Sequence, residues 1–288
     1  MGWRVFRVVF RLRSKLHIGC GRVGNLQRTR PYATGRVLWG ALTMRLTRDA
    51  ANGSGPATDS REYQRVGKQL HRFVAYTYFY AATKAGTSYE VAWPWPDGDR
   101  FRRRFLSSYS STALSYPQQS AETGTLREVE FIAPQTLDTD EQVFLVGYVF
   151  ENDGCRLDWK EACKRLQFGG ERGYGWGDLA LIEACEASSE NLFNGKARFS
   201  GAGERPVISL LASESSPEFL LAHTLTANVP ASGEVEPLVG REWRSDNDNT
   251  HARHVGQHVE FSGVHFGPGS TVDRPLDFKI GNFGIWQG

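Results

Sequence analysis

The sequence of 288 residues predicts an α+β protein, because its first half mixes strand-like and helix-like patterns and its last third contains short strand-like runs. Residues 3–16 alternate apolar and polar side chains, with Phe6 and Phe10 on one face, which is typical of a half-buried strand. Residues 36–50 place apolar side chains at helical spacing instead. Residues 207–288 contain no strong helical pattern.

The remaining elements are predicted from local periodicity and from turn residues. We expect, in chain order, a helix over 60–83, strands over 89–95, 128–133 and 142–150, a helix over 158–166, and strands over 178–184, 207–211, 219–229, 255–266 and 277–286. Residues 94–128 lack clear periodicity and are interpreted as an inserted hairpin or loop, a kind of excursion that often carries function. The polar, Gly-rich residues 187–206 are the best candidate linker, so we predict domains over 1–186 and 187–288.

Positive charge is concentrated at the amino-terminal end of the chain. The first 48 residues contain ten arginines, one lysine and no acid, while the whole chain is formally +2, which leaves about −9 on the other 240 residues. Because aromatic and aliphatic side chains are interleaved with these arginines, the pattern favours a folded surface that binds nucleic acid over a membrane surface. The outward side of the first strand, which carries Arg7, Arg11, Arg13 and Lys15, is either a solvated face or a face beside a phosphate backbone.

Membrane insertion and secretion are not expected. The longest apolar runs, such as 143–150, are too short to span a bilayer, and the sequence starts with charge and alternation and has no signal-peptide pattern. The cysteines show no CxxC pairing, so we expect reduced thiols in a cytoplasmic protein.

Two further motifs have weak support. Gly19 to Gly24 matches a dinucleotide-binding fingerprint, but Pro31 excludes an immediate helix and no acid follows about 20 residues on, so no nucleotide cofactor is expected. His251, His254 and His258 have helical spacing that could hold zinc, but Gly256 weakens a helix there, so we favour a loop or strand and no metal site. His17 and His71 are the other candidates for acid–base chemistry.

The segment Phe168 to Gly177 has five glycines in nine residues between a predicted helix and a predicted strand. Glycines let a backbone approach a ligand closely, Arg172 adds charge, and Tyr174 and Trp176 offer stacking faces. A tight structural connection is the alternative interpretation. The interleaved arginine and aromatic side chains favour single-stranded RNA.

Several of these segments together resemble the CRISPR-associated RAMP superfamily, most closely its 5′-handle-capping (Cas family five) subunits of type III-D and type VII systems. The matching segments are Leu16-His17-Ile18-Gly19, Tyr32 to Leu42, the glycine loop 168–177, and the C-terminal segments 266–270, 278–280 and 284–286. The extra helix from residue 60 and Ala33-Thr34-Gly35, in place of a Pro-Gly-Ser turn, depart from the family pattern.

This resemblance implies a ferredoxin-like (RRM-like) core with an inserted β-hairpin thumb, followed by a β-rich domain. It implies a non-catalytic subunit that caps the crRNA 5′ handle and docks onto the first RAMP backbone subunit, because no acid for target slicing precedes Asp49. A large polymerase-like subunit or a separate nuclease subunit is a further candidate partner. The alternatives are a metal-independent crRNA-processing endoribonuclease that uses His17, and a protein-interaction module whose basic face is incidental.

The site residues predicted on this basis fall into two groups. Unneutralised arginines of the amino-terminal third are expected to converge with the glycine loop and its aromatic residues on one RNA-binding surface, and either ion pairing of these arginines with the acidic remainder or placement of the two elements on opposite sides of the molecule would refute it. The RNA-binding candidates are Arg28, Arg30, Tyr32, Arg36, Trp39 (equally compatible with the core), Arg45, Gly169, Gly170, Arg172, Tyr174 and Trp176. The thumb candidates are Phe101, Arg102, Arg103, Arg104 and Phe105.

Overall fold

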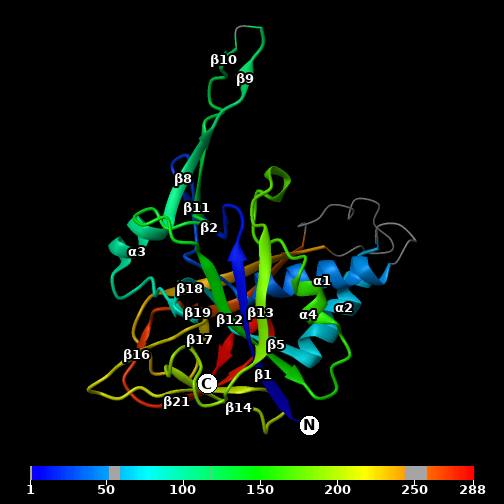
Figure 1. Ribbon diagram of the computed structural model, residues 1–288, viewed down its shortest axis with the longest axis vertical. Coiled ribbons are helices and arrows are strands. Elements are labelled where there is room, and N and C mark those ends of the chain that lie inside the picture. Colours follow the sequence, from blue (N-terminus) through cyan, green and yellow to red (C-terminus); the bar gives the residue numbers. More distant parts are fainter. Residues whose placement is uncertain (1, 52–58, 118, 244–257) are drawn as a thin grey trace.

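The computed structural model describes residues 2–51, 59–117, 119–243 and 258–288 and shows a mixed α+β protein that is rich in sheet and has few helices (Figure 1). The first large sheet contains β1 (Trp3–Leu12), β4 (Tyr32–Ala33), β5 (Val74–Tyr76), β6 (Phe79–Ala85), β7 (Ser88–Val91), β12 (Phe144–Asn152) and β13 (Leu179–Glu186). The second contains β14 (Ala197–Ser200), β15 (Val207–Leu210), β17 (Thr224–Leu225), β18 (Val235–Glu242), β19 (His258–Phe266), β21 (Leu276–Ile280) and β22 (Trp286–Gln287).

The first sheet has the order β13-β1-β12-β6-β4, and each of these neighbouring pairs is antiparallel. One face is covered by α1 (Gly35–Ala50), α2 (Ser60–Phe73) and α4 (Trp159–Cys163). Phe6 and Phe10 of β1 pack there in one buried cluster with Leu42 of α1 and Trp159 of α4. The removal of these apolar side chains from water stabilises the contact between sheet and helices. None of the helices in the described part is long and apolar enough to cross a membrane.

The opposite face of this sheet packs against the second sheet. Trp3 and Tyr80 from the first sheet share a buried cluster with Leu220 and Trp286. The Tyr80 hydroxyl donates a hydrogen bond of 2.5 Å to the carbonyl of Leu221. Residues Leu192, Phe193 and Ala197 are buried in the same cluster, so the segment predicted to be a linker is part of the core between the two sheets. The domain boundary itself stays a prediction.

A smaller sheet of order β2-β3-β11-β8 lies beside the end of β1 and extends into a hairpin that projects from the body (Figure 1). The hairpin follows α3 in the chain, and the short two-stranded ribbon β9–β10 lies at its tip. The elements are β2 (Gly19–Val23), β3 (Leu26–Thr29), α3 (Gly98–Phe105), β8 (Leu106–Ser111), β9 (Leu114–Ser115), β10 (Ser120–Ala121) and β11 (Arg127–Ile132). The remaining short elements are η1 (Arg172–Tyr174), β16 (Glu218–Phe219), β20 (Thr271–Val272) and η2 (Asn282–Gly284).

The second helix is shorter than its predicted range. It begins at Ser60, where Asp59 accepts a hydrogen bond of 2.9 Å from the N–H of Arg61, but it ends at Phe73 and not at residue 83. Residues 74–82 lie beside β12 in the sheet and are buried on both of its faces. Because neither face meets water, their sequence is almost continuously apolar and does not alternate. Such a run does not distinguish a buried strand from a helix by periodicity.

The C-terminal turn η2 packs against the first two helices. The Phe283 ring stands edge-on to Trp39 at 5.0 Å and to His71 at 4.6 Å, and Trp39 and His71 stack at 5.0 Å with an angle of 8°. A Cβ on Gly35 would lie 2.3 Å from the carbonyl oxygen of Phe283, so only glycine permits this approach at the start of α1. Burial, reinforced by the positive charges of Arg205 and Arg36, lowers the pKa of His71 to about 4.

This lowered pKa predicts an acid-sensitive contact between the C-terminal turn and the helices. His71 has a pKa of about 4 when folded and an ordinary value of 6.5, so between these values the unfolded chain binds more protons and the free energy of unfolding falls with the pH. His71→Phe keeps an aromatic stack and cannot titrate, so from about pH 7 to about pH 4 it should lose about 1–3 kcal/mol less than the wild type. Urea unfolding at a series of pH values measures the difference, and parallel pH profiles would contradict it.

Candidate nucleic-acid interface

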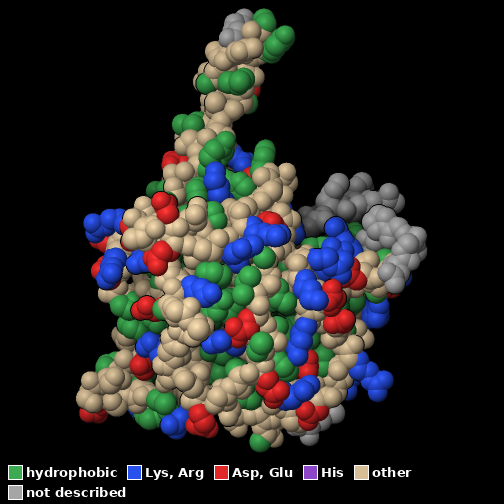
Figure 2. Space-filling model, in the orientation of Figure 1, with side chains coloured by type: hydrophobic (Ala, Val, Ile, Leu, Met, Phe, Trp, Pro, Cys, Tyr) green, Lys and Arg blue, Asp and Glu red, His purple; other side chains and the backbone are tan. Residues whose placement is uncertain are grey.

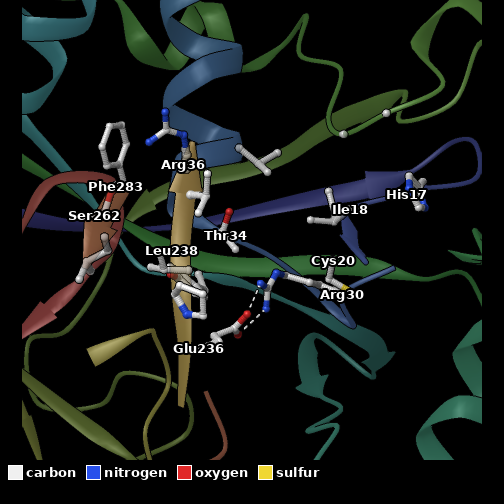
Figure 3. A pocket seen from close by; sticks show the side chains of 18 residues that line it. His17, Ile18, Cys20, Arg30, Thr34, Arg36, Glu236, Leu238, Ser262 and Phe283 are labelled. Carbon is white, nitrogen blue, oxygen red and sulfur yellow. Dashed lines mark hydrogen bonds and ion pairs between the residues drawn. The ribbon is translucent and has the colours of Figure 1, made fainter. Parts of the chain in front are cut away.

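A cavity of about 640 Å³ lies where several separate parts of the chain meet (Figure 3). Its walls come from the segment after β1, the start of α1, the glycine loop 168–177, the β18–β19 ribbon and the C-terminal turn η2, together with Tyr78. The amino-terminal third of the chain and the glycine loop, which we expected to converge, therefore both line this cavity. The residues that matter for its chemistry are His17, Ile18, Arg30, Thr34, Arg36, Gly169, Gly170, Glu236 and Phe283.

The glycine loop is fastened by its backbone to the strand end before it. The N–H of Gly170 donates to the carbonyl of His17 at 2.9 Å, and the N–H of Gly177 donates to the carbonyl of Lys15 at 2.7 Å. Gly169 has a φ of +74°, and a Cβ there would lie 2.1 Å from the His17 oxygen. A Cβ on Gly177, at a φ of +77°, would lie 1.8 Å from the carbonyl oxygen of Phe168. At these two positions glycine is required by close packing, as the structural interpretation of the motif anticipated.

His17 is buried, and its ring is held in one orientation. Its Nδ1 lies 2.7 Å from the carbonyl oxygen of Glu130 and, since a carbonyl only accepts, Nδ1 donates this hydrogen bond. The buried carboxylate of Glu130 also accepts hydrogen bonds of 2.9 Å from the N–H of Thr29 and from Arg102. Glu130 of β11 thus fixes His17, β3 and α3 relative to one another.

Arg30 is neutralised inside the cavity by an acid from the second sheet. Its guanidinium donates to both oxygens of Glu236 at 2.8 and 2.6 Å (Figure 3), and Glu236 lies 2.7 Å from Nε2 of His223. The Nδ1 of His223 is in turn 2.7 Å from the hydroxyl of Tyr78. Although burial acts in the opposite direction, the hydrogen bonds from Arg30 and His223 hold the pKa of Glu236 well below its usual range.

The same holds for most of the amino-terminal arginines. Arg36 pairs with Glu242 at 3.2 Å and lies 4.4 Å from the centre of the Phe283 ring, and Arg45 pairs with Asp49 at 2.9 Å. Arg4, Arg7 and Arg13 also form ion pairs, and Figure 2 shows positive and negative side chains interspersed on one face of the molecule. The expectation that Arg30, Arg36 and Arg45 are unneutralised is wrong, because acids that are distant in sequence, or one helical turn away, fold onto them.

Three arginines lie on segments that also contribute residues to the cavity wall and have no ion pair with any residue in the described ranges. We call them the rim arginines: Arg22, Arg28 and Arg172. Arg22 and Arg28 lie on the β2–β3 hairpin, and Arg172 lies in the glycine loop. Both segments lie next to the start of β11, because β3 pairs with Glu128 and Val129 while Glu171 of the loop pairs with Arg127.

Of the four aromatic residues predicted to stack on bases, one is open to solvent. Tyr174 is 76% exposed, whereas Trp176 is 8% exposed and packs 5.3 Å from Phe131. Tyr32 is buried, and burial raises its pKa to about 12. Trp39 donates to the carbonyl of Gly67 at 3.1 Å within the helix contact described above. Stacking by Tyr32, Trp176 or the half-buried Trp39 would require them to leave these contacts.

The predicted thumb residues lie at the base of the hairpin. Phe101 and Phe105 are buried on α3 and stack at 4.9 Å, so these two rings are part of the core and not a projecting wedge. Arg102 pairs with Glu130, and Arg104 pairs with Glu141, while Arg103 is exposed. The projecting part is instead the Ser-rich stretch between β8 and β11, whose exposed rings are Tyr109 and Tyr116.

No cluster of three or more potential metal-ligating side chains occurs in the portion of the chain that is described. His251 and His254 lie outside the described residues, and His258 is the first residue of β19.

Comparisons with known proteins give only distant likenesses. No family model matches the sequence, and no curated protein matches it. A chain of the type III-B Cmr-beta structure bound to cognate target RNA and AMPPnP is 10% identical with a TM-score of 0.47, over 92% of this chain and 85% of that chain. A chain of the target-RNA-bound Cmr-beta structure is 8% identical with a TM-score of 0.37, over 62% of this chain and 96% of that chain. Scores and identities this low establish neither a family nor a function.

The glycine contacts predict which loop positions tolerate a side chain. Gly169→Ala should lower the free energy of unfolding by about 2 kcal/mol or more, because its φ is positive and its Cβ would overlap the His17 carbonyl. Gly173→Ala, in the same loop, is the matched control, since nothing lies within 4 Å of a Cβ there and its φ is not positive. Denaturant unfolding measures both, and equal losses would contradict the assigned role of Gly169.

Proposed function

We propose that this chain is a non-catalytic RNA-binding subunit of a CRISPR ribonucleoprotein effector complex. In this role it caps the 5′ handle of the crRNA and docks onto the first backbone subunit. The observation that carries the proposal is the meeting of the Leu16–Gly19 segment, the start of α1 and the glycine loop at one cavity, with the rim arginines on two of the segments that line it. These are the segments in which the sequence resembles the RAMP superfamily.

The topology supports a ferredoxin-like core for this subunit. The antiparallel order β13-β1-β12-β6, with α1 and α2 between β1 and β6 and α4 between β12 and β13, is the order of a βαββαβ unit. The projecting β8–β11 hairpin would then be the thumb. Its outer residues 107–121 contain no charged side chain, so it suits insertion between nucleotides or contact with a neighbouring subunit better than phosphate binding.

The ion pairs favour phosphate binding by the rim arginines over phosphate binding inside the cavity. Arg30 and Arg36 are already paired with Glu236 and Glu242, so a phosphate that replaced either acid would leave a partly buried carboxylate without its partner. The rim arginines need no such exchange. Tyr174, exposed in the same loop as Arg172, is placed to stack on an unpaired base.

This arrangement predicts salt-dependent binding of handle RNA. If the rim arginines neutralise about 3 phosphates, affinity should fall roughly 20- to 40-fold between about 50 and 200 mM salt. Arg28→Ala and Arg172→Ala should each weaken binding and reduce the salt slope by about 1, and Tyr174→Ala should cost about 1–3 kcal/mol. Filter binding with handle RNA and with a permuted handle measures these effects.

Arg156→Ala is the control for these variants, because Arg156 is exposed on the segment before α4 and does not line the cavity. It should leave both affinity and salt slope unchanged. A flat salt response, or equal losses for Arg156→Ala and Arg172→Ala, would refute binding at this rim. Sequencing the RNA that co-purifies with the complex tests whether the ligand is a crRNA handle.

A second candidate function is metal-independent cleavage of repeat RNA. The observation that favours it is the position of His17, which lines the cavity and whose ring is held by the hydrogen bond from Nδ1 to the carbonyl of Glu130. Incubation of the protein with repeat RNA in EDTA separates the two functions. Cleavage that is lost in His17→Ala would favour the nuclease, and intact RNA bound to the protein would favour the cap.

A further inference from the structure

The side chain of Lys15 lies in a box of three aromatic rings outside the cavity. Its Nζ is 4.1 Å from the centre of the Tyr109 ring, 5.0 Å from Phe131 and 5.2 Å from Trp176. Lys15 is half-buried, and it forms no ion pair with any residue in the described ranges. The ammonium group is therefore held by ring faces alone, an arrangement that is strengthened where water is partly excluded.

The box joins three parts of the structure that are far apart in the sequence. Lys15 follows β1, Tyr109 and Phe131 lie on the two arms of the projecting hairpin, and Trp176 belongs to the glycine loop. Trp176 also contacts both rings directly, at 6.1 Å from Tyr109 and 5.3 Å from Phe131.

A second tie between loop and hairpin lies beside the box. Arg127, at the start of β11, pairs with Glu171 of the loop, and its guanidinium lies 5.7 Å from the centre of the Tyr174 ring. Tyr174 is the exposed aromatic residue of the loop. Because Tyr174 lies beside Arg127 of the hairpin, a ligand that stacks on Tyr174 contacts a residue that is itself next to the hairpin.

The hairpin needs such an anchor because it leaves the body as a two-stranded ribbon (Figure 1). A two-stranded ribbon on its own is marginally stable. The direction of the outer ribbon relative to the loop is therefore set at its base, where β11 also pairs with β3 and where Tyr109 and Phe131 meet Lys15 and Trp176.

We propose that Lys15 is a positioning residue that couples the glycine loop to the hairpin, so that a ligand on the loop also fixes the direction in which the hairpin points. The identity of that ligand as RNA rests on the proposed function above. The coupling of loop and hairpin is a property of the free protein and does not depend on it.

Distance measurements between spin labels test this positioning in the full chain. One label is placed on the hairpin by Ser120→Cys and the other on the body by Arg156→Cys, with Cys20, Cys155 and Cys185 replaced by serine. Lys15→Met, which keeps the length of the side chain and removes its charge, should broaden the distance distribution. Lys15→Arg should restore the wild-type width, since a guanidinium also binds ring faces.

Lys160→Met is the matched control, because Lys160 lies 3.6 Å from the centre of the Phe6 ring, a contact of the same kind that does not touch the hairpin. It should leave the distribution unchanged. A wild-type width in Lys15→Met, or equal broadening in both lysine variants, would overturn the proposal. If Lys15→Met does not fold, Trp176→Phe, which keeps a smaller ring, must broaden the distribution in its place.

Handle RNA separates failure of the coupling from failure of the proposed function. Added to the spin-labelled wild type, it should narrow the distribution, and this response should be lost in Lys15→Met at RNA concentrations that saturate the variant. Bound RNA without narrowing in the wild type would overturn the coupling. Absence of RNA binding would refute the proposed function and leave the free-protein comparison as the test of Lys15.

Discussion

The backbone contact between the glycine loop and the strand end at Lys15–His17 is the constraint on which the rest of the site depends. Two N–H groups of the loop bond to the carbonyls of Lys15 and His17, and no Cβ fits at Gly169. This contact closes one wall of the cavity with Gly169 and Gly170 and places Trp176 against Phe131 at the base of the hairpin. A side chain at Gly169 would therefore disturb the cavity and the hairpin together.

The charge asymmetry of the sequence has a structural explanation that its composition does not reveal. The amino-terminal arginines are balanced largely by acids that arrive from later elements: Glu151, Asp178 and Glu183 from the first sheet and its approach, and Glu236 and Glu242 from β18. The positive charge at the start of the chain is therefore used largely in ion pairs with acids from later parts of the chain. What remains for an anionic ligand is the smaller group of arginines at the rim.

Much of the fold was predictable from the sequence, because local patterns determine it. The alternation in β1 and the helical spacing of α1 reproduce the observed elements within a few residues, and the glycine loop lies between a helix and a strand as predicted. The end of α2 was not predictable, since residues 74–82 are apolar on both faces of a buried strand. β18 was missed because its inward side carries Glu236 and Glu242 and its outward side carries Val235 and Val239, so neither face is purely polar or apolar. The partners of Arg30 and Arg36 are 206 residues away, and no local pattern encodes such a distance.

The chain of hydrogen bonds from Arg30 through Glu236 and His223 to Tyr78 explains why the interior and the rim of the cavity should behave differently. It links the first sheet to the second through groups that are mostly withdrawn from water, so removing any one member leaves a polar group without its partner. A ligand that competed for Arg30 would pay that cost and would also loosen the contact between the sheets. The rim arginines carry no such structural duty. The same arginine-rich sequence therefore supplies two kinds of residue, those that hold the two halves together and those that are free to meet a phosphate.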